Sequence, residues 1–308
     1  MTKSGHIAKI RKVVLGIAFR LMGPAMVFCL TFNVQSLPAV SAADSPADQG
    51  GAIQSLDPML AKSEDAFVEF MLTKQKVHSK YLRLRHQRLQ QLLKRRDVYR
   101  PKEINAFLLT PREEFTRKLN RGLAYNNAAL IIGYGVTLSG PHLVGRMSSA
   151  LDVQPGEKVL EIGTGSGYHS AFLASLTDKV YTIEIIEPLA AETDKIYQDL
   201  VARGYTAYQN IVRKTDDGYY GWEQYAPFDK IIVTCGIDHI PPPLLKQLKV
   251  GGTMVIPVGP PTSQTVLKVK KQQDDAGNFT ITREDIYQGR KKVTFVPFTK
   301  KGGGTHFK

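Results

Sequence analysis

The sequence predicts an α/β protein with a doubly wound, mostly parallel sheet of the Rossmann-like type and antiparallel strands at its C-terminal end. Three observations lead to this prediction. Apolar strand-like runs alternate with helical patterns from residue 151 onward, a glycine-rich turn follows the first run, and the last three strand-like segments have no helical pattern between them. With 43% hydrophobic and 22% charged residues in 308, the composition is that of a folded globular protein.

The predicted main domain covers residues 151–300. Its alternation begins at Lys158–Gly163, a short apolar run that ends on glycine, as buried strands of parallel sheets often do. Proline near the start and glycine at the end mark a helix over Glu187–Gly204. Further strands are expected at Lys179–Ile186, 207–214, Phe228–Cys235 and 251–259, further helices at Tyr168–Leu176 and 241–249, and the antiparallel strands at 264–272, 279–288 and 292–298.

The first 43 residues differ in kind from the rest. Basic residues precede the apolar run Leu21–Phe32, and small residues follow it, which is the order of parts in a secretory signal. The run is shorter than the roughly 20 residues of a membrane-spanning helix. We expect residues 1–43 to direct export to the periplasm, with an uncleaved N-terminal anchor or an over-long gene start as the alternatives. Their removal would lower the formal net charge from +13 to +8, so the mature chain stays basic.

Two short segments precede the main part of the chain, and one follows it. Residues 44–62 are rich in Ala, Ser and Gly and are interpreted as a linker. Residues 63–98 place apolar side chains on one helical face and Lys and Arg on the other, which predicts one basic amphipathic helix. This helix either docks on the main domain or a second subunit, or contacts nucleic acid or a membrane surface. Residues 301–308 are expected to be a flexible tail.

The turn after the first strand, in "VLEIGTGSGYHS", is the candidate cofactor site. Small residues alternate there between a predicted strand and a predicted helix, where open α/β sheets bind their ligands. Glu161 precedes this loop and is expected to point into the ligand-binding crevice, and Glu184 ends the next strand about 20 residues later, where an acid can accept both hydroxyls of a ribose. The loop residues are Gly163, Thr164, Gly165, Ser166 and Gly167.

The residue pattern of this loop favours S-adenosylmethionine over NAD as the ligand. A dinucleotide fingerprint requires a third glycine where this chain has Tyr168. Glu161, expected at the base of the loop, would repel a pyrophosphate but attract a ligand that carries an ammonium and a sulfonium. A glycine-rich turn without any ligand is the other alternative.

A third acid completes the candidate cofactor site. Asp217 and Gly218 follow the third strand, where the carboxylate would meet the adenine amino group and the glycine would leave space for the base. Tyr219, Tyr220 and Trp222 either stack on the base or pack in the core. No metal site is expected, because the two cysteines have no metal-ligand spacing.

Several blocks of the sequence together resemble the protein-L-isoaspartate (D-aspartate) O-methyltransferase family. They are "GYGVTLSGPHLVGRM" (133–147), "VLEIGTGSGYHSA", "DDGYYG", the block 226–259 and "VTFVPF" (293–298). The T-x-S-x-P pattern ahead of the domain and the "LKxGGxxxxPVG" pattern behind it single out this family. The resemblance places the sheet in the S-adenosylmethionine-dependent methyltransferase type and makes residues 99–150 an N-terminal cap with the substrate and catalytic loop.

The resemblance also implies a reaction and an acceptor. The cofactor would be S-adenosylmethionine, and the methyl group would go to the α-carboxyl of L-isoaspartyl or D-aspartyl residues in damaged proteins or peptides, which initiates their repair. The family's catalytic hydroxyl falls on Ser139, with Thr137 beside it. A serine hydroxyl can hydrogen-bond the attacking carboxylate, although "TLSGP" also suits a turn that caps a helix.

The chain departs from the family after the fourth strand. The family has a small uncharged loop there, whereas this chain places Asp238 and His239 where an anionic acceptor should approach. An aspartate would repel the acceptor unless it points away or pairs with His239. The alternatives are therefore methylation of a different carboxylate, in a peptide or small molecule, or a catalytically silent cofactor-binding protein on the same fold. A cytoplasmic location is the alternative that the family and the supply of its cofactor favour.

Overall fold

The computed structural model describes residues 57–75 and 77–308. The predicted export signal and most of the predicted linker 44–62 lie outside this part of the chain. None of the helices in the described part is long and apolar enough to cross a membrane.

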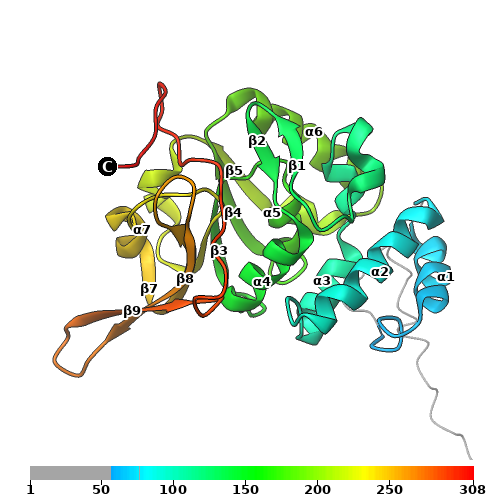
Figure 1. Ribbon diagram of the computed structural model, residues 1–308, viewed down its shortest axis with the longest axis horizontal. Helices are drawn as coiled ribbons and strands as arrows, with labels where there is room; N and C mark the ends of the chain where they lie inside the picture. The colour runs from blue at the N-terminus through cyan, green and yellow to red at the C-terminus, as the bar shows by residue number, and fades with distance from the viewer. Residues whose placement is uncertain (1–56, 76) are drawn as a thin grey trace, which may run out of the picture. The chain divides into compact units, whose positions relative to one another are not determined.

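A seven-stranded sheet forms the centre of the domain, in the order β5-β4-β3-β6-β7-β8-β9 (Figure 1). Neighbouring strands from β5 to β7 are parallel, whereas β8 and β9 are antiparallel to their neighbours. The predicted fold class is thereby confirmed. The strands are β3 (Lys158–Ile162), β4 (Lys179–Glu184), β5 (Ile211–Thr215), β6 (Phe228–Val233), β7 (Leu248–Val258), β8 (Thr265–Gln273) and β9 (Phe279–Asp285).

The order of the strands creates a switch point between β3 and β6. The chain runs outward from β3 through β4 to β5 and then returns to β6 on the other side of β3. Connections on the two sides of such a point leave opposite faces of the sheet, which opens a crevice at the carboxyl ends of the strands. The hairpin of β8 and β9 extends beyond the rest of the sheet (Figure 1).

Both faces of β3 and β6 are covered by apolar side chains. Val159 and Ile232 belong to one hydrophobic cluster, and Leu160 and Ile231 belong to the other, as the alternation of side chains along a strand requires. Helices α4 (Pro141–Leu151), α5 (Tyr168–Ala174) and α6 (Glu187–Ala202) supply residues to the first cluster, as do the helices between residues 64 and 109, and α7 (Pro242–Gln247) supplies residues to the second.

Two predicted strands differ in the structure. Residues 206–210 form a 3-10 helix, so the strand predicted over 207–214 begins only at Ile211. The segment 292–298 pairs only through isolated bridges, one of them between Pro297 and Gly236. Proline has no amide proton to give to a ladder, which is one reason that this segment does not extend the sheet.

The predicted flexible tail, residues 301–308, is instead packed against the domain. Thr299 and Thr305 form an antiparallel bridge, and the amide of His306 donates to the carbonyl of Phe298 at 2.8 Å. His306 itself is buried. The prediction of a flexible tail is therefore wrong, because the glycines form a tight turn that brings the following residues back onto the domain.

The single basic helix predicted over 63–98 is two helices, α1 (Glu64–Lys74) and α2 (Ser79–Lys94). The two helices lie against each other as a hairpin. A hydrogen bond of 2.8 Å from Arg83 in α2 to Glu64 at the start of α1 joins them. A hydrophobic periodicity alone cannot show where such a helix breaks, since both halves present an apolar face.

The predicted basic face is also partly buried. Arg85 is fully buried and pairs with Glu113 at 2.9 Å, and the side chain of Arg88 donates to the carbonyl of Tyr125. These arginines therefore attach α2 to the cap. This arrangement agrees with the docked helix that the sequence offered as one alternative, and it leaves fewer charges for nucleic acid or a membrane.

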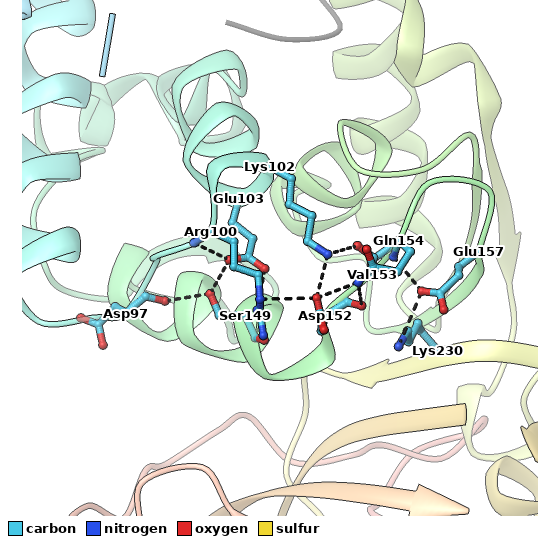
Figure 2. Close-up of polar contacts among 10 residues, drawn as sticks. All are labelled: Asp97, Arg100, Lys102, Glu103, Ser149, Asp152, Val153, Gln154, Glu157 and Lys230. Carbon is cyan, nitrogen blue, oxygen red and sulfur yellow. Dashed lines mark hydrogen bonds and ion pairs between the residues drawn. The ribbon is translucent and has the colours of Figure 1, made fainter. Parts of the chain in front are cut away.

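The cap between α2 and the sheet consists of short elements. Figure 2 shows how one of them, α3, is tied to the end of α4: Lys102 donates to Asp152 at 2.7 Å, and Arg100 donates to the carbonyl of Ser149 at 2.8 Å. Polar contacts of Arg100 and Lys102 with residues 149–153 thus join this part of the cap to the end of α4 and the segment that follows it. The remaining cap elements are α3 (Pro101–Leu109), η1 (Arg112–Phe115), η2 (Lys118–Leu123), β1 (Leu130–Gly133) and β2 (Val136–Leu138).

Candidate active site

A cavity of about 490 Å³ lies at the carboxyl ends of β3 and β4, beside the end of β6. Its wall combines the β1–β2 hairpin, the loop after β3, the end of β4 and the C-terminal segment 295–303. Glu161, Gly167 and Asp217 are not among its lining residues. The other predicted site residues do line it, namely Thr137, Ser139, Gly163, Thr164, Gly165, Ser166, Glu184 and Gly218.

The loop after β3 requires glycine at two of its positions. Gly163 has a φ of +92°, and a Cβ atom there would overlap the hydroxyl of Thr234. Gly167 has a φ of +88°, and a Cβ atom would lie 2.6 Å from the hydroxyl of Tyr197. Both positions are in the left-handed region that side chains avoid. The loop therefore presents backbone, and not side chains, to the cavity at Gly163.

The polar residues of this loop differ in how they are satisfied. The hydroxyl of Thr164 lies 2.7 Å from that of Thr182 in the neighbouring strand. The hydroxyl of Ser166 is buried and has no hydrogen-bond partner in the described part of the chain. Since buried polar groups are nearly always paired, Ser166 provides one free hydroxyl on the cavity wall for a ligand.

Glu184 joins the end of β4 to the glycine loop. Its carboxylate accepts a hydrogen bond from the amide of Gly165 at 2.8 Å and from the amides of Ile185 and Ile186 at 3.0 Å each. Burial raises the pKa of this carboxyl, and the three amide bonds act in the opposite direction. The acid is thus fixed at the position where the sequence predicted a ribose-binding carboxylate.

Glu161 lies behind the loop and not in the crevice, contrary to the expectation. Its carboxyl is fully buried, accepts from Thr182 at 2.7 Å and is bonded to Ser170. Burial raises its pKa to about 8, so the group is protonated at neutral pH. The sequence-based prediction that a charged Glu161 repels a pyrophosphate and attracts a cationic ligand is therefore wrong, because the buried carboxyl is neutral.

Asp217 faces the C-terminal tail. His306 Nε2 lies 2.9 Å from one oxygen of Asp217 and 3.0 Å from the other, and the amide of Tyr219 donates to the same carboxylate at 3.0 Å. The ring of Tyr219 stacks on that of His306 with centroids 4.1 Å apart. The aromatic ring next to the predicted adenine acid is thus occupied by the tail. Gly218, by contrast, lines the cavity as expected.

The other two aromatic residues after β5 do not line the cavity either. Trp222 packs against Tyr181 and Tyr225, and Tyr220 is largely exposed. Their alternative interpretation, as packing residues, fits Trp222.

The β1–β2 hairpin presents the candidate catalytic loop. Thr137 pairs with Ile131 across the hairpin and is exposed, while Ser139 follows β2 and is half-buried. Gly140 is the N-cap of α4, with proline next to it at the first helical position. The "TLSGP" stretch therefore serves as the turn into a helix, and its Thr137 and Ser139 also line the cavity, so the structural interpretation does not exclude the catalytic one.

Asp238 does not face the acceptor side of the cavity. Its carboxylate pairs with His239 Nδ1 at 2.6 Å and accepts from the backbone amide of Lys308 at 2.7 Å. Burial alone would raise its pKa, but these hydrogen bonds hold the pKa of the carboxyl below its usual value. Neither Asp238 nor His239 lines the cavity. Asp238 would repel an anionic acceptor unless it points away from the acceptor or pairs with His239, and this pair with His239 is present in the structure.

The cavity contains several residues that the sequence did not single out. Burial lowers the pKa of His169 to about 3, and its Nε2 lies 2.9 Å from the hydroxyl of Ser148. Burial also holds the pKa of Cys235 well above its usual value, so this cysteine is a neutral thiol. The largest omission is the segment 295–303, whose position on the cavity wall depends on contacts with residues far away in the sequence.

Comparison with known proteins identifies the family. The family model described as protein-L-isoaspartate(D-aspartate) O-methyltransferase matches residues 84–303. The chain belongs to this family. Among its relatives, a protein-L-isoaspartate O-methyltransferase 1 of Nitrosospira multiformis is 51% identical over 181 residues, which are 58% of this chain and 70% of the relative. A protein-L-isoaspartate O-methyltransferase 2 of Polaromonas sp. is 45% identical over 190 residues, 61% of this chain and 83% of the relative.

Solved structures share the fold of this methyltransferase. One, described as a protein-L-isoaspartate O-methyltransferase from Plasmodium falciparum in complex with S-adenosyl-L-homocysteine, has a TM-score of 0.57 at 20% identity and covers 70% of this chain and 97% of its own. Another protein-L-isoaspartate O-methyltransferase has a TM-score of 0.54 at 25% identity and covers 69% of this chain and 65% of its own. The predicted family and cofactor, S-adenosylmethionine, are confirmed.

The cavity of this methyltransferase fits such a cofactor. The backbone of Gly163 is open to the cavity, the Ser166 hydroxyl is unpaired, and the Glu184 carboxylate is held in place by three amides. The exposed backbone lets a ligand approach closely, the free hydroxyl can hydrogen-bond it, and the fixed carboxylate can accept hydrogen bonds from it. A nucleoside that carries an amino-acid chain has groups for all three contacts.

Proposed function

We propose that this chain transfers a methyl group from S-adenosylmethionine to the α-carboxyl of L-isoaspartyl and D-aspartyl residues in damaged proteins, and so initiates their repair. One observation carries the proposal: Ser139 and the glycine loop line the same cavity. An acceptor held at Ser139 and a cofactor held at residues 163–166 would therefore meet inside one cavity. Family membership supports the same reaction.

Individual residues have distinct proposed roles in holding the cofactor. Gly163, Thr164, Gly165 and Ser166 would surround its amino-acid portion, Glu184 would accept the ribose hydroxyls, and Gly218 with Asp217 would border the adenine. Gly167 and Glu161 would act indirectly by shaping the loop. The bound cofactor supplies an electrophilic methyl group on a sulfonium.

The chemical demands on the protein itself are modest. A carboxylate is already an anionic nucleophile at neutral pH, so no general base is needed. The chain has to orient one carboxylate oxygen and exclude water. The hydroxyl of Ser139 would donate a hydrogen bond to the other oxygen of the acceptor, with Thr137 beside it at the exposed rim. His169 is neutral at physiological pH because of its burial, so it adds no charge to the cavity.

The product chemistry offers a test of the proposal. A methyl ester of an isoaspartyl residue closes to a succinimide, and part of the succinimide reopens as normal aspartate. Repeated cycles with wild-type protein should therefore convert an isoaspartyl peptide into its aspartyl form, which chromatography resolves. Ester formation on unrelated carboxylates without this conversion would support a different acceptor, and cofactor binding without any methyl transfer would support a silent binding protein.

We further propose that residues 1–43 direct export, so that repair acts on proteins outside the cytoplasm. The order of basic, apolar and small residues supports this proposal. N-terminal sequencing of the mature protein, together with cell fractionation, tests it. An intact Met1 in the cytosolic fraction would favour the cytoplasmic alternative.

A further inference from the structure

Two fully buried arginines in the cap differ in how their charges are compensated. Arg85 pairs with the carboxylate of Glu113 at 2.9 Å, and neither side chain is exposed. Arg112 is equally buried, but no carboxylate forms an ion pair with it anywhere in residues 57–75 and 77–308. Burial of an unpaired cation is costly, so its retention needs a compensating interaction.

The contacts of Arg112 are with backbone carbonyls and an aromatic ring. Its Nε donates to the carbonyl of Ala124, and its Nη2 donates to the carbonyl of Ser139, both at 2.6 Å. Its Cζ lies 4.7 Å from the centre of the Tyr168 ring. Its Nη1 is buried and has no hydrogen-bond partner in the described chain. Arg112 thus holds the backbone of the proposed catalytic residue and keeps one donor free.

The position of this charge relates it to the acceptor. Ser139 and Tyr168, which Arg112 contacts, both line the cavity, whereas Arg112 itself does not. The guanidinium therefore lies directly behind the residues that form the cavity wall, on the side of the catalytic loop. Burial lowers the pKa of Arg112, and the neighbouring Tyr168 and Tyr125 offset only part of this effect, yet a guanidinium keeps its proton at any physiological pH. No carboxylate in residues 57–75 and 77–308 pairs with this charge, so an anion in the adjoining cavity would be attracted to it.

We propose that Arg112 is a positioning and specificity residue for the carboxylate acceptor, which fixes the backbone of Ser139 through its guanidinium and favours an anion in the adjoining cavity through its charge. The inference rests on the proposed function, because it takes the α-carboxyl of an isoaspartyl residue as the acceptor. It assigns two separable tasks to one side chain. The two hydrogen bonds of the planar guanidinium, to the carbonyls of Ala124 and Ser139, would position the catalytic loop and so affect kcat. The positive charge would determine how strongly the cavity prefers a carboxylate over a neutral analogue.

Two variants separate these tasks. Arg112→Met removes both the charge and the fork, whereas Arg112→Lys keeps a charge but cannot reproduce the planar fork that reaches two carbonyls. Arg117→Met is a matched control. Arg117 also donates to a backbone carbonyl, that of Ile132 in the β1–β2 hairpin, but it is half-exposed and paired with Glu192.

The decisive readout is a ratio of two binding constants. Binding of an isoaspartyl peptide and of the same peptide with its α-carboxyl replaced by a carboxamide is measured by calorimetry, with S-adenosylhomocysteine present. We expect the preference for the carboxylate to fall roughly tenfold in Arg112→Met, to be kept in Arg112→Lys and in Arg117→Met, and kcat to fall in both Arg112 variants. Thermal melting and S-adenosylhomocysteine affinity establish that each variant is folded.

The outcomes separate failure of this inference from failure of the proposed function. An unchanged carboxylate preference in folded Arg112→Met would overturn the inference. If Arg112→Met does not fold, the inference is tested by Arg112→Lys alone. Because this variant keeps the charge, loss of its carboxylate preference would overturn the inference. Absence of isoaspartyl methylation by the wild-type protein would instead overturn the proposed function, since the two binding constants need no turnover.

Discussion

His306 in the C-terminal tail is hydrogen-bonded to both oxygens of Asp217, at 2.9 and 3.0 Å. The same imidazole stacks on Tyr219, so it combines the two kinds of contact that an adenine ring would make: a donor to an acid and a face against an aromatic ring. A tail residue and the cofactor would therefore compete for one carboxylate.

Replacement of His306 should strengthen cofactor binding. His306→Ala removes the competing donor, so we expect a several-fold lower dissociation constant for S-adenosylhomocysteine, together with a lower Tm without ligand because Asp217 loses a partner. Calorimetry and thermal melting measure the two effects. Phe307→Ala, which leaves both Asp217 contacts in place, is the control. Weaker binding by His306→Ala would mean that the tail closes over the bound cofactor and does not compete with it.

Glu184→Gln should weaken cofactor binding with little effect on the fold. The amide side chain has a single acceptor oxygen, and its NH2 group would oppose one of the three backbone amides that now donate to the carboxylate. We expect the affinity for S-adenosylhomocysteine to fall on the order of ten- to hundredfold. Glu187→Gln, at an exposed position three residues later, should bind as wild type does. Equal affinities for the two variants would exclude Glu184 from the cofactor site.

Ser139→Ala should reduce turnover and leave cofactor binding intact. A hydrogen bond to a charged acceptor contributes about 1.5 to 3 kcal/mol, so kcat/KM should fall on the order of ten- to hundredfold. Ser175→Ala, remote from this cavity, is the control and should keep full activity. A variant at Ser139 that loses cofactor affinity in proportion to activity would point to a structural role of the hydroxyl.

The free energy of unfolding should depend on pH through Glu161. Its folded pKa of about 8 lies above the ordinary value of 4.5. Between these values the folded protein keeps a proton that the unfolded chain has lost, so this group lowers stability as pH rises, by at most about 1.4 kcal/mol per pH unit. Above about pH 8 the effect ends. Urea titrations from pH 5 to 8 should show a smaller decline for Glu161→Gln, and parallel declines in the two proteins would contradict the assignment.

Local sequence patterns predicted the sheet and the glycine loop well. Strand and helix periodicities are set within about ten residues, and the turn at Gly163 and the acid at Glu184 follow from the order of a strand, a turn and a helix. These features need no knowledge of distant contacts. The predicted acids and glycines at the ends of β3 and β4 therefore fell close to the cavity.

Several features that the sequence did not show depend on contacts outside the local pattern. Glu161 was expected in the crevice, but its direction is decided by Ser170 and Thr182, which bury it. Arg85 was placed on a solvated face because charge is usually exposed, and only the fold brings Glu113 to it. The contact of His306 with Asp217 joins residues 89 positions apart, which no local pattern records.

The measurement that tests the central claim most directly is the initial rate of labelled methyl transfer to an isoaspartyl peptide and to its normal aspartyl twin. The two peptides have the same composition and charge, and differ only in which carboxyl is free beside the backbone. We predict rapid transfer to the isoaspartyl peptide and none above background to the twin. Equal rates for the two peptides, or no transfer to either, would contradict the account.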